Sequence, residues 1–123
     1  MKKILFFLFI FILISCNNHE RNCNDFKTGK FEFAQVVNGK KEVSIFIRTD
    51  KIQIETYKNK TDTATVRWVN DCEFILQKLH PKNRKEQRAI SIKILFTEKN
   101  SYTFEYSFVG SNEKQRGKVT KLD

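Results

Sequence analysis

The side chains that could do chemistry are few in this sequence, and their spacing does not build a catalytic or metal site. A metal site needs ligands at coordinating spacing, which His19, Cys23, Cys72 and His80 do not show. A Ser or Cys nucleophile needs a base within reach, and His80 beside Pro81 is the one histidine outside the polar N-terminal segment. Four unclustered glycines supply no phosphate-binding loop. We therefore expect a protein that is not an enzyme and holds no cofactor or metal.

Acid–base chemistry by paired carboxylates is also not expected. Glu32, Glu55, Glu73 and Glu105 alternate with apolar residues along the chain. In a half-buried strand this alternation places such glutamates on the solvent side. There they would pair with lysines rather than act as a general acid or base.

The first cysteine, Cys16, follows a leader typical of exported proteins. Lys2 and Lys3 precede an uncharged apolar run over residues 4–14. That run is shorter than the roughly 20 residues that cross a bilayer as a helix, and it has the layout of a signal peptide. Its end, Leu13-Ile14-Ser15-Cys16, resembles the lipobox of bacterial lipoproteins.

The resemblance implies cleavage before Cys16 and acylation of its thiol with palmitate-type chains. One chain anchors a protein only marginally, whereas two or three hold it on a membrane. We expect residues 1–15 to be the signal peptide, 16–25 the lipidated cysteine and a tether, and 26–123 a single domain. The expected location is the cell envelope, by default the periplasmic face of the outer membrane, with exposure at the cell surface left open.

The positive charge of the chain indicates which kinds of partner it could bind. The 123 residues carry a formal net charge of +9, which favours nucleic acid, an anionic membrane or an acidic polymer. For an exported, anchored chain we expect membrane or envelope polymer and no nucleic acid. The alternative is that lysines on strand faces keep a sheet soluble and discourage edge-to-edge pairing.

The two other cysteines, Cys23 and Cys72, form an even remainder in an oxidising compartment, which indicates a disulfide. A loop of this length would add about 4 kcal/mol in the chain-entropy model. The alternative keeps Cys72 as a buried thiol and Cys23 exposed in the tether, because the sequence gives no distance between them.

Alternation with period two dominates the chain after residue 26 and predicts β-strands. The clearest are 90–96 and 102–108, which a polar turn at 98–101 joins into a hairpin. Residues 71–79 fit either a strand or a helix, and the turn-forming pair Asn70-Asp71 favours the strand. Further strands are expected at 29–35, 43–48, 52–55, 64–68 and 118–122, with Val43, Ile45 and Ile47 opposite Ser44 and Arg48, and Ile52 and Ile54 opposite Gln53 and Glu55.

About eight strands without a crossover helix predict an all-β, antiparallel up-and-down meander, and closure into a barrel removes its exposed edges. Gly29-Lys30-Phe31 resembles the Gly-x-aromatic first strand of lipocalin-like lipoproteins of the calycin type. Trp68 with Asn70, Asp71 and Cys72 resembles their mid-barrel strand pair. The resemblance implies a small lipocalin-like barrel or a strongly curved sheet. In that family the first-strand motif usually carries tryptophan where this chain has Phe31. The sequence also shows no arginine in a position to cap that aromatic ring.

Eight-stranded barrels can hold one small ligand, or their side chains can fill the interior of so small a domain. The leading expectation is a membrane-anchored envelope lipoprotein with a non-enzymatic binding or structural role toward a protein or polymer. The alternatives are a carrier of a small apolar ligand and a surface inhibitor of a hydrolase. The candidate cavity residues are Phe31, Phe33, Trp68, Tyr102, Phe104, Tyr106 and Phe108.

Overall fold

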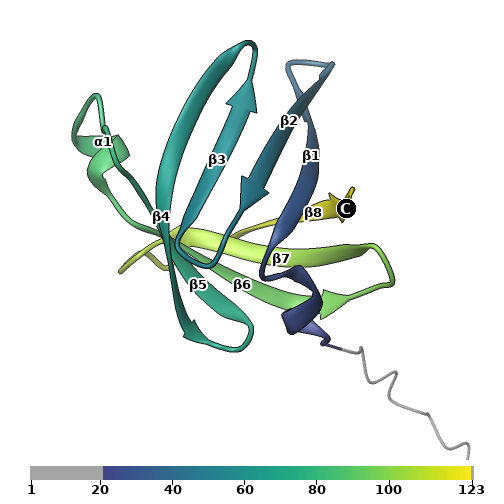
Figure 1. The fold of residues 1–123 in the computed structure, drawn as a ribbon. Coiled ribbons are helices and arrows are strands. Elements are labelled where there is room, and N and C mark those ends of the chain that lie inside the picture. Colours follow the sequence, from purple (N-terminus) through teal and green to yellow (C-terminus); the bar gives the residue numbers. More distant parts are fainter. Residues whose placement is uncertain (1–20, 123) are drawn as a thin grey trace, which may run out of the picture.

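The computed structural model describes residues 21–122, so Cys16 and the predicted cleavage site lie outside the described residues. The described chain forms eight antiparallel strands in up-and-down order that close into a barrel (Figure 1). The elements are a 3₁₀ helix η1 (Cys23–Phe26), β1 (Gly29–Val37), β2 (Lys40–Arg48), β3 (Ile52–Tyr57), β4 (Lys60–Asn70), β5 (Glu73–Lys78), α1 (Arg84–Gln87), β6 (Ile90–Thr97), β7 (Ser101–Phe108) and β8 (Gln115–Lys121).

The predicted fold class is confirmed. Every strand pairs with its sequence neighbour, and β8 returns to β1. The ambiguous segment 71–79 is a strand over Glu73–Lys78, and the hairpin of β6 and β7 forms as expected. Tight turns make these connections short. Asn38 and Gly39 both have positive φ, at 52° and 77°, which is the requirement of the type I′ turn common in hairpins.

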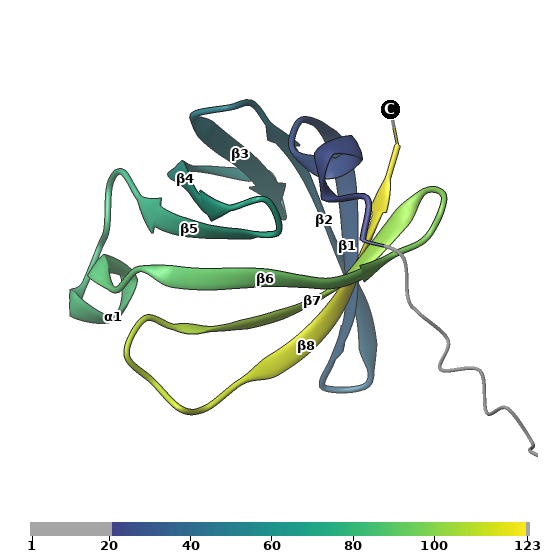
Figure 2. The ribbon, with the colours of Figure 1, turned by 90° about the horizontal axis from the view of Figure 1, so that it is seen from below.

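The length over which neighbouring strands pair varies around the barrel. β1 pairs with β2 over nine residues but with β8 over only three, Phe31 to Phe33. β5 pairs with β6 over four residues that end at Leu76 and Ile90. Beyond that point β5 continues to Lys78, and the connection that carries α1 follows it before β6 begins at Ile90 (Figure 2). The β5–β6 pairing therefore ends on the side of the barrel where α1 lies.

The inward face of β2 is the opposite of the predicted one. Ser44, Phe46 and Arg48 are buried in the barrel, whereas Val43 and Ile47 are 38% and 49% exposed. The alternation itself was predicted correctly, but its phase was wrong. Because side chains of a strand point alternately to opposite faces, an error of phase inverts every residue of the strand.

A stacked pair of phenylalanines accounts for this phase. Phe46 lies opposite Phe31 in the register of β1 and β2, and their ring centroids are 5.1 Å apart. An inward Phe46 sends its two isoleucine neighbours outward. The β2–β3 register then puts Gln53 and Glu55 on the inner face as well. The prediction that Glu55 faces solvent is therefore wrong.

The 3₁₀ helix η1 closes one end of the barrel. The side chains of Cys23 and Phe26 are buried, and a disulfide joins Cys23 to Cys72 at the β4–β5 turn with a Cα–Cα distance of 5.4 Å. Just before the helix, Arg21 Nη2 donates a hydrogen bond to the carbonyl of Ile94 at 2.8 Å. Residues 21–25, predicted as part of a tether, therefore belong to the closed end of the barrel.

Candidate functional site

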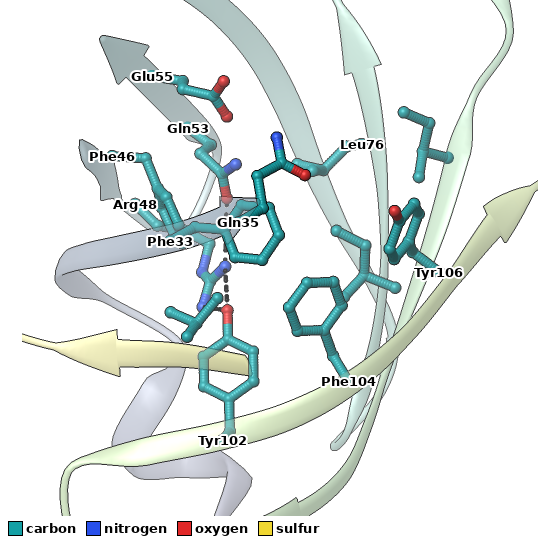
Figure 3. A pocket seen from close by; sticks show the side chains of 13 residues that line it. Phe33, Gln35, Phe46, Arg48, Gln53, Glu55, Leu76, Tyr102, Phe104 and Tyr106 are labelled. Carbon is teal, nitrogen blue, oxygen red and sulfur yellow. Dashed lines mark hydrogen bonds between the residues drawn. The ribbon is translucent and has the colours of Figure 1, made fainter. Parts of the chain in front are cut away.

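The barrel contains a cavity of about 250 Å³, which we call the inner cavity (Figure 3). Its wall is mainly aromatic and aliphatic, with a few polar side chains among the apolar ones. The lining residues are Phe33, Gln35, Phe46, Arg48, Gln53, Glu55, Leu76, Ile90, Ile92, Tyr102, Phe104, Tyr106 and Val119. A mostly apolar hollow with a few placed polar groups is the usual composition of a small-molecule site.

A second hollow of about 430 Å³, the outer cavity, continues the first toward α1. The two cavities share Gln53, Glu55, Leu76 and Ile90 in their walls. Leu76 and Ile90 are also the last residues at which β5 and β6 pair. The mouth of the inner cavity therefore lies beside the end of the β5–β6 pairing, where the inner cavity meets the outer one.

Arg48 forms the floor of the inner cavity and is only 2% exposed. Its Nε and Nη2 donate to the carbonyls of Lys27 and Phe26 at 3.2 and 2.6 Å. Nη1 donates to Gln53 Oε1 at 3.1 Å, and both Nη atoms donate to the Tyr102 hydroxyl at 3.3 and 3.2 Å. These five bonds use all five N–H groups of the guanidinium, so Arg48 has no donor left for a ligand.

Aromatic rings surround the same guanidinium. Its carbon lies 4.6 Å from the ring centroid of Phe31 and 4.5 Å from that of Phe74, with Trp68 at 6.0 Å. Such cation–π contacts stabilise a desolvated cation. An arginine therefore does cap the aromatic residue of the Gly-x-aromatic motif, although the sequence did not place one.

The Tyr102 hydroxyl is held beneath the cavity by Arg48. Burial raises the pKa of Tyr102, and the adjacent guanidinium offsets part of that effect. The hydroxyl therefore stays protonated at neutral pH, accepting the two Arg48 bonds. The ring packs edge-on against Phe26 of η1, with centroids 5.3 Å apart.

Glu55 is the acidic side chain of the inner cavity, at the opposite end from Arg48 and Tyr102 (Figure 3). Burial raises the pKa of Glu55, the negative charge of Asp62 raises it further, and Lys78 acts in the opposite direction. Among residues 21–122 its carboxylate has no hydrogen bond and no ion pair. It is an acceptor without a partner in the wall of the cavity.

Three of the six charged side chains that line the outer cavity pair with one another. Lys78 Nζ lies 2.8 Å from Glu86 Oε1 and 4.0 Å from Asp62 Oδ2. The hydrogen bond to Glu86 raises the pKa of Lys78. Arg88 lies over the ring of Phe108, 4.2 Å from its centroid. These contacts hold α1 and the flanking loop against the end of β5.

The structure brings together five of the seven predicted cavity residues. Phe31 and Trp68 do not line the inner or the outer cavity, because both pack at the closed end, where Trp68 lies against Phe74 at a centroid distance of 4.6 Å. The inner cavity is lined by Phe33, Tyr102, Phe104 and Tyr106, and the outer one by Phe108.

Sequence reasoning missed the polar residues of the site. Arg48, Gln53 and Glu55 were placed on outer faces, because the isoleucines next to them seemed to mark the inner one. One available signal was Phe46, an aromatic residue in phase with Arg48. A second was the turn at residues 49–51: the hairpin that it makes puts Arg48 opposite Gln53, so the polar residues of β2 and β3 lie on the same face.

The described part of the chain offers neither a metal cluster nor a membrane-spanning helix. Within residues 21–122 no three His, Cys, Asp or Glu side chains lie together in a way that could hold a metal ion. In the same range no helix has the length and apolar character needed to span a bilayer.

Comparison with known proteins does not assign the chain to a family. It matches no protein-family model, no curated protein and no solved structure at a significant level.

Proposed function

We propose that this protein is an envelope lipoprotein whose barrel binds one small amphipathic molecule without converting it chemically. The observation that carries the proposal is the inner cavity of about 250 Å³, closed at one end by Arg48 and adjoining the outer cavity at the other. Its volume lies just under the usual range of roughly 300–1,000 Å³ for ligand sites. A compact ligand, or one that extends into the outer cavity, fits this space.

The lining supports an amphipathic ligand over a purely apolar one. Phe33, Phe46 and Phe104 offer an apolar wall, whereas Gln35 and Glu55 offer polar groups on the same cavity. A hydrocarbon would leave the carboxylate of Glu55 desolvated and without a partner, which is costly. A molecule with one polar end and one apolar end avoids this cost.

Anchoring through an acylated Cys16 is the second part of the proposal and is supported by the lipobox-like Leu13-Ile14-Ser15-Cys16. Arg21, the first described residue, contacts the closed end of the barrel. Five residues of chain span at most about 18 Å, so the anchor would hold this end near the membrane. The mouth would then face away from that membrane, and the ligand would enter from the aqueous side.

The anchor is tested by producing the full chain in a bacterium and analysing the membrane fraction by intact-mass spectrometry. A mature chain that begins at Cys16 and carries acyl chains is expected. Cys16→Ser is the matched variant and should remain unprocessed at the leader. A soluble, unacylated wild-type protein would refute the anchored part of the proposal and leave the cavity part unaffected.

Ligand binding is tested by native mass spectrometry of the mature chain from residue 17, which contains the whole barrel, after secretion into a periplasm. A small adduct that is lost on denaturation is the expected result, and its mass identifies the ligand class. A bare mass in every preparation, together with no binding of added amphiphiles, would contradict the proposal.

A protein partner is the second candidate, and one specific feature favours it. Residues 34–37 of β1 pair with β2 but, within the described chain, have no partner strand on their other side. All four are exposed, Val36 by 74%, and none carries a charge. Such an edge accepts an added strand. Hydrogen exchange checks it, because the outward amides of Ala34 and Val36 should exchange fast unless a partner is bound.

A further inference from the structure

The charge distribution inside the barrel indicates which kind of polar end the ligand carries. Glu55 lies in the wall shared by both cavities and has no hydrogen-bond or ion-pair partner among the described residues. The cation whose charge acts on it, Lys78, is already bound to Glu86 at 2.8 Å. The carboxylate therefore remains available to a ligand.

The one cation of the inner cavity cannot serve an anionic ligand in the same way. All five N–H groups of Arg48 are used by Phe26, Lys27, Gln53 and Tyr102. Lys85 and Arg88 line only the outer cavity, and the guanidinium of Arg88 lies over Phe108. An anionic head group held in the inner cavity would therefore meet the free carboxylate of Glu55 and no free cationic donor among the residues that line this cavity.

The apolar part of a ligand has a defined place below Glu55. Phe33, Phe46 and Phe104 line the inner cavity, which has Glu55 at one end and Arg48 with Tyr102 at the other (Figure 3). Phe33 of β1 and Phe104 of β7 meet edge to face over Gly117 of β8, with ring centroids 5.8 Å apart. A short alkyl chain or a single ring in this space removes apolar surface from water, which favours binding.

We infer that the barrel selects a small amphipathic cation, an alkyl- or arylammonium, whose N–H groups donate to the carboxylate of Glu55 while its apolar part occupies the inner cavity. This inference rests on the proposed binding function and specifies its ligand. An ammonium supplies both the missing hydrogen-bond donors and the missing positive charge. Charge-assisted hydrogen bonds of this kind are about twice as strong as neutral ones.

Three probes with the same tail isolate the head group: octylamine, octan-1-ol and octanoate. Each is titrated into the mature chain by isothermal calorimetry at pH 7, with binding at the cavity followed by NMR shifts of the Gln53 side-chain amide. Octylammonium should bind at least about tenfold tighter than octanoate, the value expected for one hydrogen bond to a charged group. In Glu55→Gln the preference should fall to about twofold or less.

Glu32→Gln is the matched control, because Glu32 lies on β1 next to the inward-facing Phe31 and does not line either cavity. It removes the same charge and should keep the full preference for the ammonium. Equal binding of all three probes, tighter binding of octanoate, or an unchanged preference in Glu55→Gln would overturn the inference and leave the binding function standing. No binding of any probe would refute the binding function itself.

Discussion

Replacing Arg48 by lysine tests whether one buried side chain holds the closed end of the barrel together. Arg48 donates five hydrogen bonds, two to backbone carbonyls near η1 and three to the side chains of Gln53 and Tyr102. A lysine ammonium has three donors, so at least two bonds are lost. At about 1.5–3 kcal/mol for each bond to a charged group, the free energy of unfolding should fall by about 3–6 kcal/mol.

This loss is large for a small domain, whose total stability is about 5–15 kcal/mol. Equilibrium urea unfolding measures it, with the fluorescence of Trp68 as the signal, since Trp68 is the single tryptophan of the chain and lies near Arg48. Arg67→Lys is the matched control. Arg67 is exposed on β4 and has no side-chain hydrogen bond or ion pair among the described residues, so its replacement should change stability by less than about 0.5 kcal/mol.

A fall of less than 1 kcal/mol in Arg48→Lys would refute the reasoning, because about two charge-assisted bonds cannot be lost at that cost. An equal effect of Arg67→Lys would also refute it, since the loss would then not depend on burial. Near-ultraviolet circular dichroism of the folded variant shows whether the aromatic packing around the floor of the cavity is retained.

Three further predictions follow from other parts of the barrel. Cys72→Ser, which breaks a disulfide that spans 49 residues, should lower the free energy of unfolding by about 4 kcal/mol in urea titrations without reductant; an unchanged midpoint would show that Cys23 is not bridged. Gly117→Ala places a Cβ 2.7 Å from Phe104 Cζ and should cost about 1–3 kcal/mol in the same assay; a neutral result would contradict this packing. The folded-state pKa of Glu55 lies above its usual 4.5, so the free energy of unfolding of the wild type falls as the pH rises from 4.5 through that raised pKa. Glu55→Gln should therefore be the more stable protein at pH 7 but not at pH 4. Thermal melts that give the opposite order would refute this prediction.

The strands could be predicted because alternation with period two does not depend on the rest of the fold. In β7 the same pattern also identifies the inner face. In β7 the large rings of Tyr102, Phe104 and Tyr106 stand on one face, and Thr103 and Glu105 occupy the other. Only one phase can bury those rings, so the local pattern was sufficient.

The phase of β2 and β3 could not be predicted in this way, because both faces of these strands carry apolar residues. The β-branched isoleucines of β2 lie on the outer face, and Phe46 with Arg48 lies on the inner one. A buried arginine is acceptable only when acceptors from distant parts of the chain surround it, as the carbonyls of Phe26 and Lys27 do here. Those contacts depend on the closed barrel and leave no trace in the local sequence.

The cavity could not be predicted from the local sequence either. The aromatic stripe of β7 indicated an interior but did not show whether that interior is filled. The hollow exists because the pairing of β5 with β6 ends at Leu76, and because polar Gln53 and Glu55 stand where a filled core would carry apolar residues. Both causes involve strands that are distant in sequence from β7.

The most direct test of the central claim is to fill the cavity and ask whether ligand binding is lost. Ile90 lines both cavities, so Ile90→Trp should occupy the space at their junction. Native mass spectra of the wild type and of Ile90→Trp are compared at equal octylamine concentration, with urea midpoints to show that both proteins are folded. The account predicts a one-to-one adduct on the wild type and none on the folded variant. An adduct of equal intensity on both would contradict it, because the ligand would then bind outside the barrel.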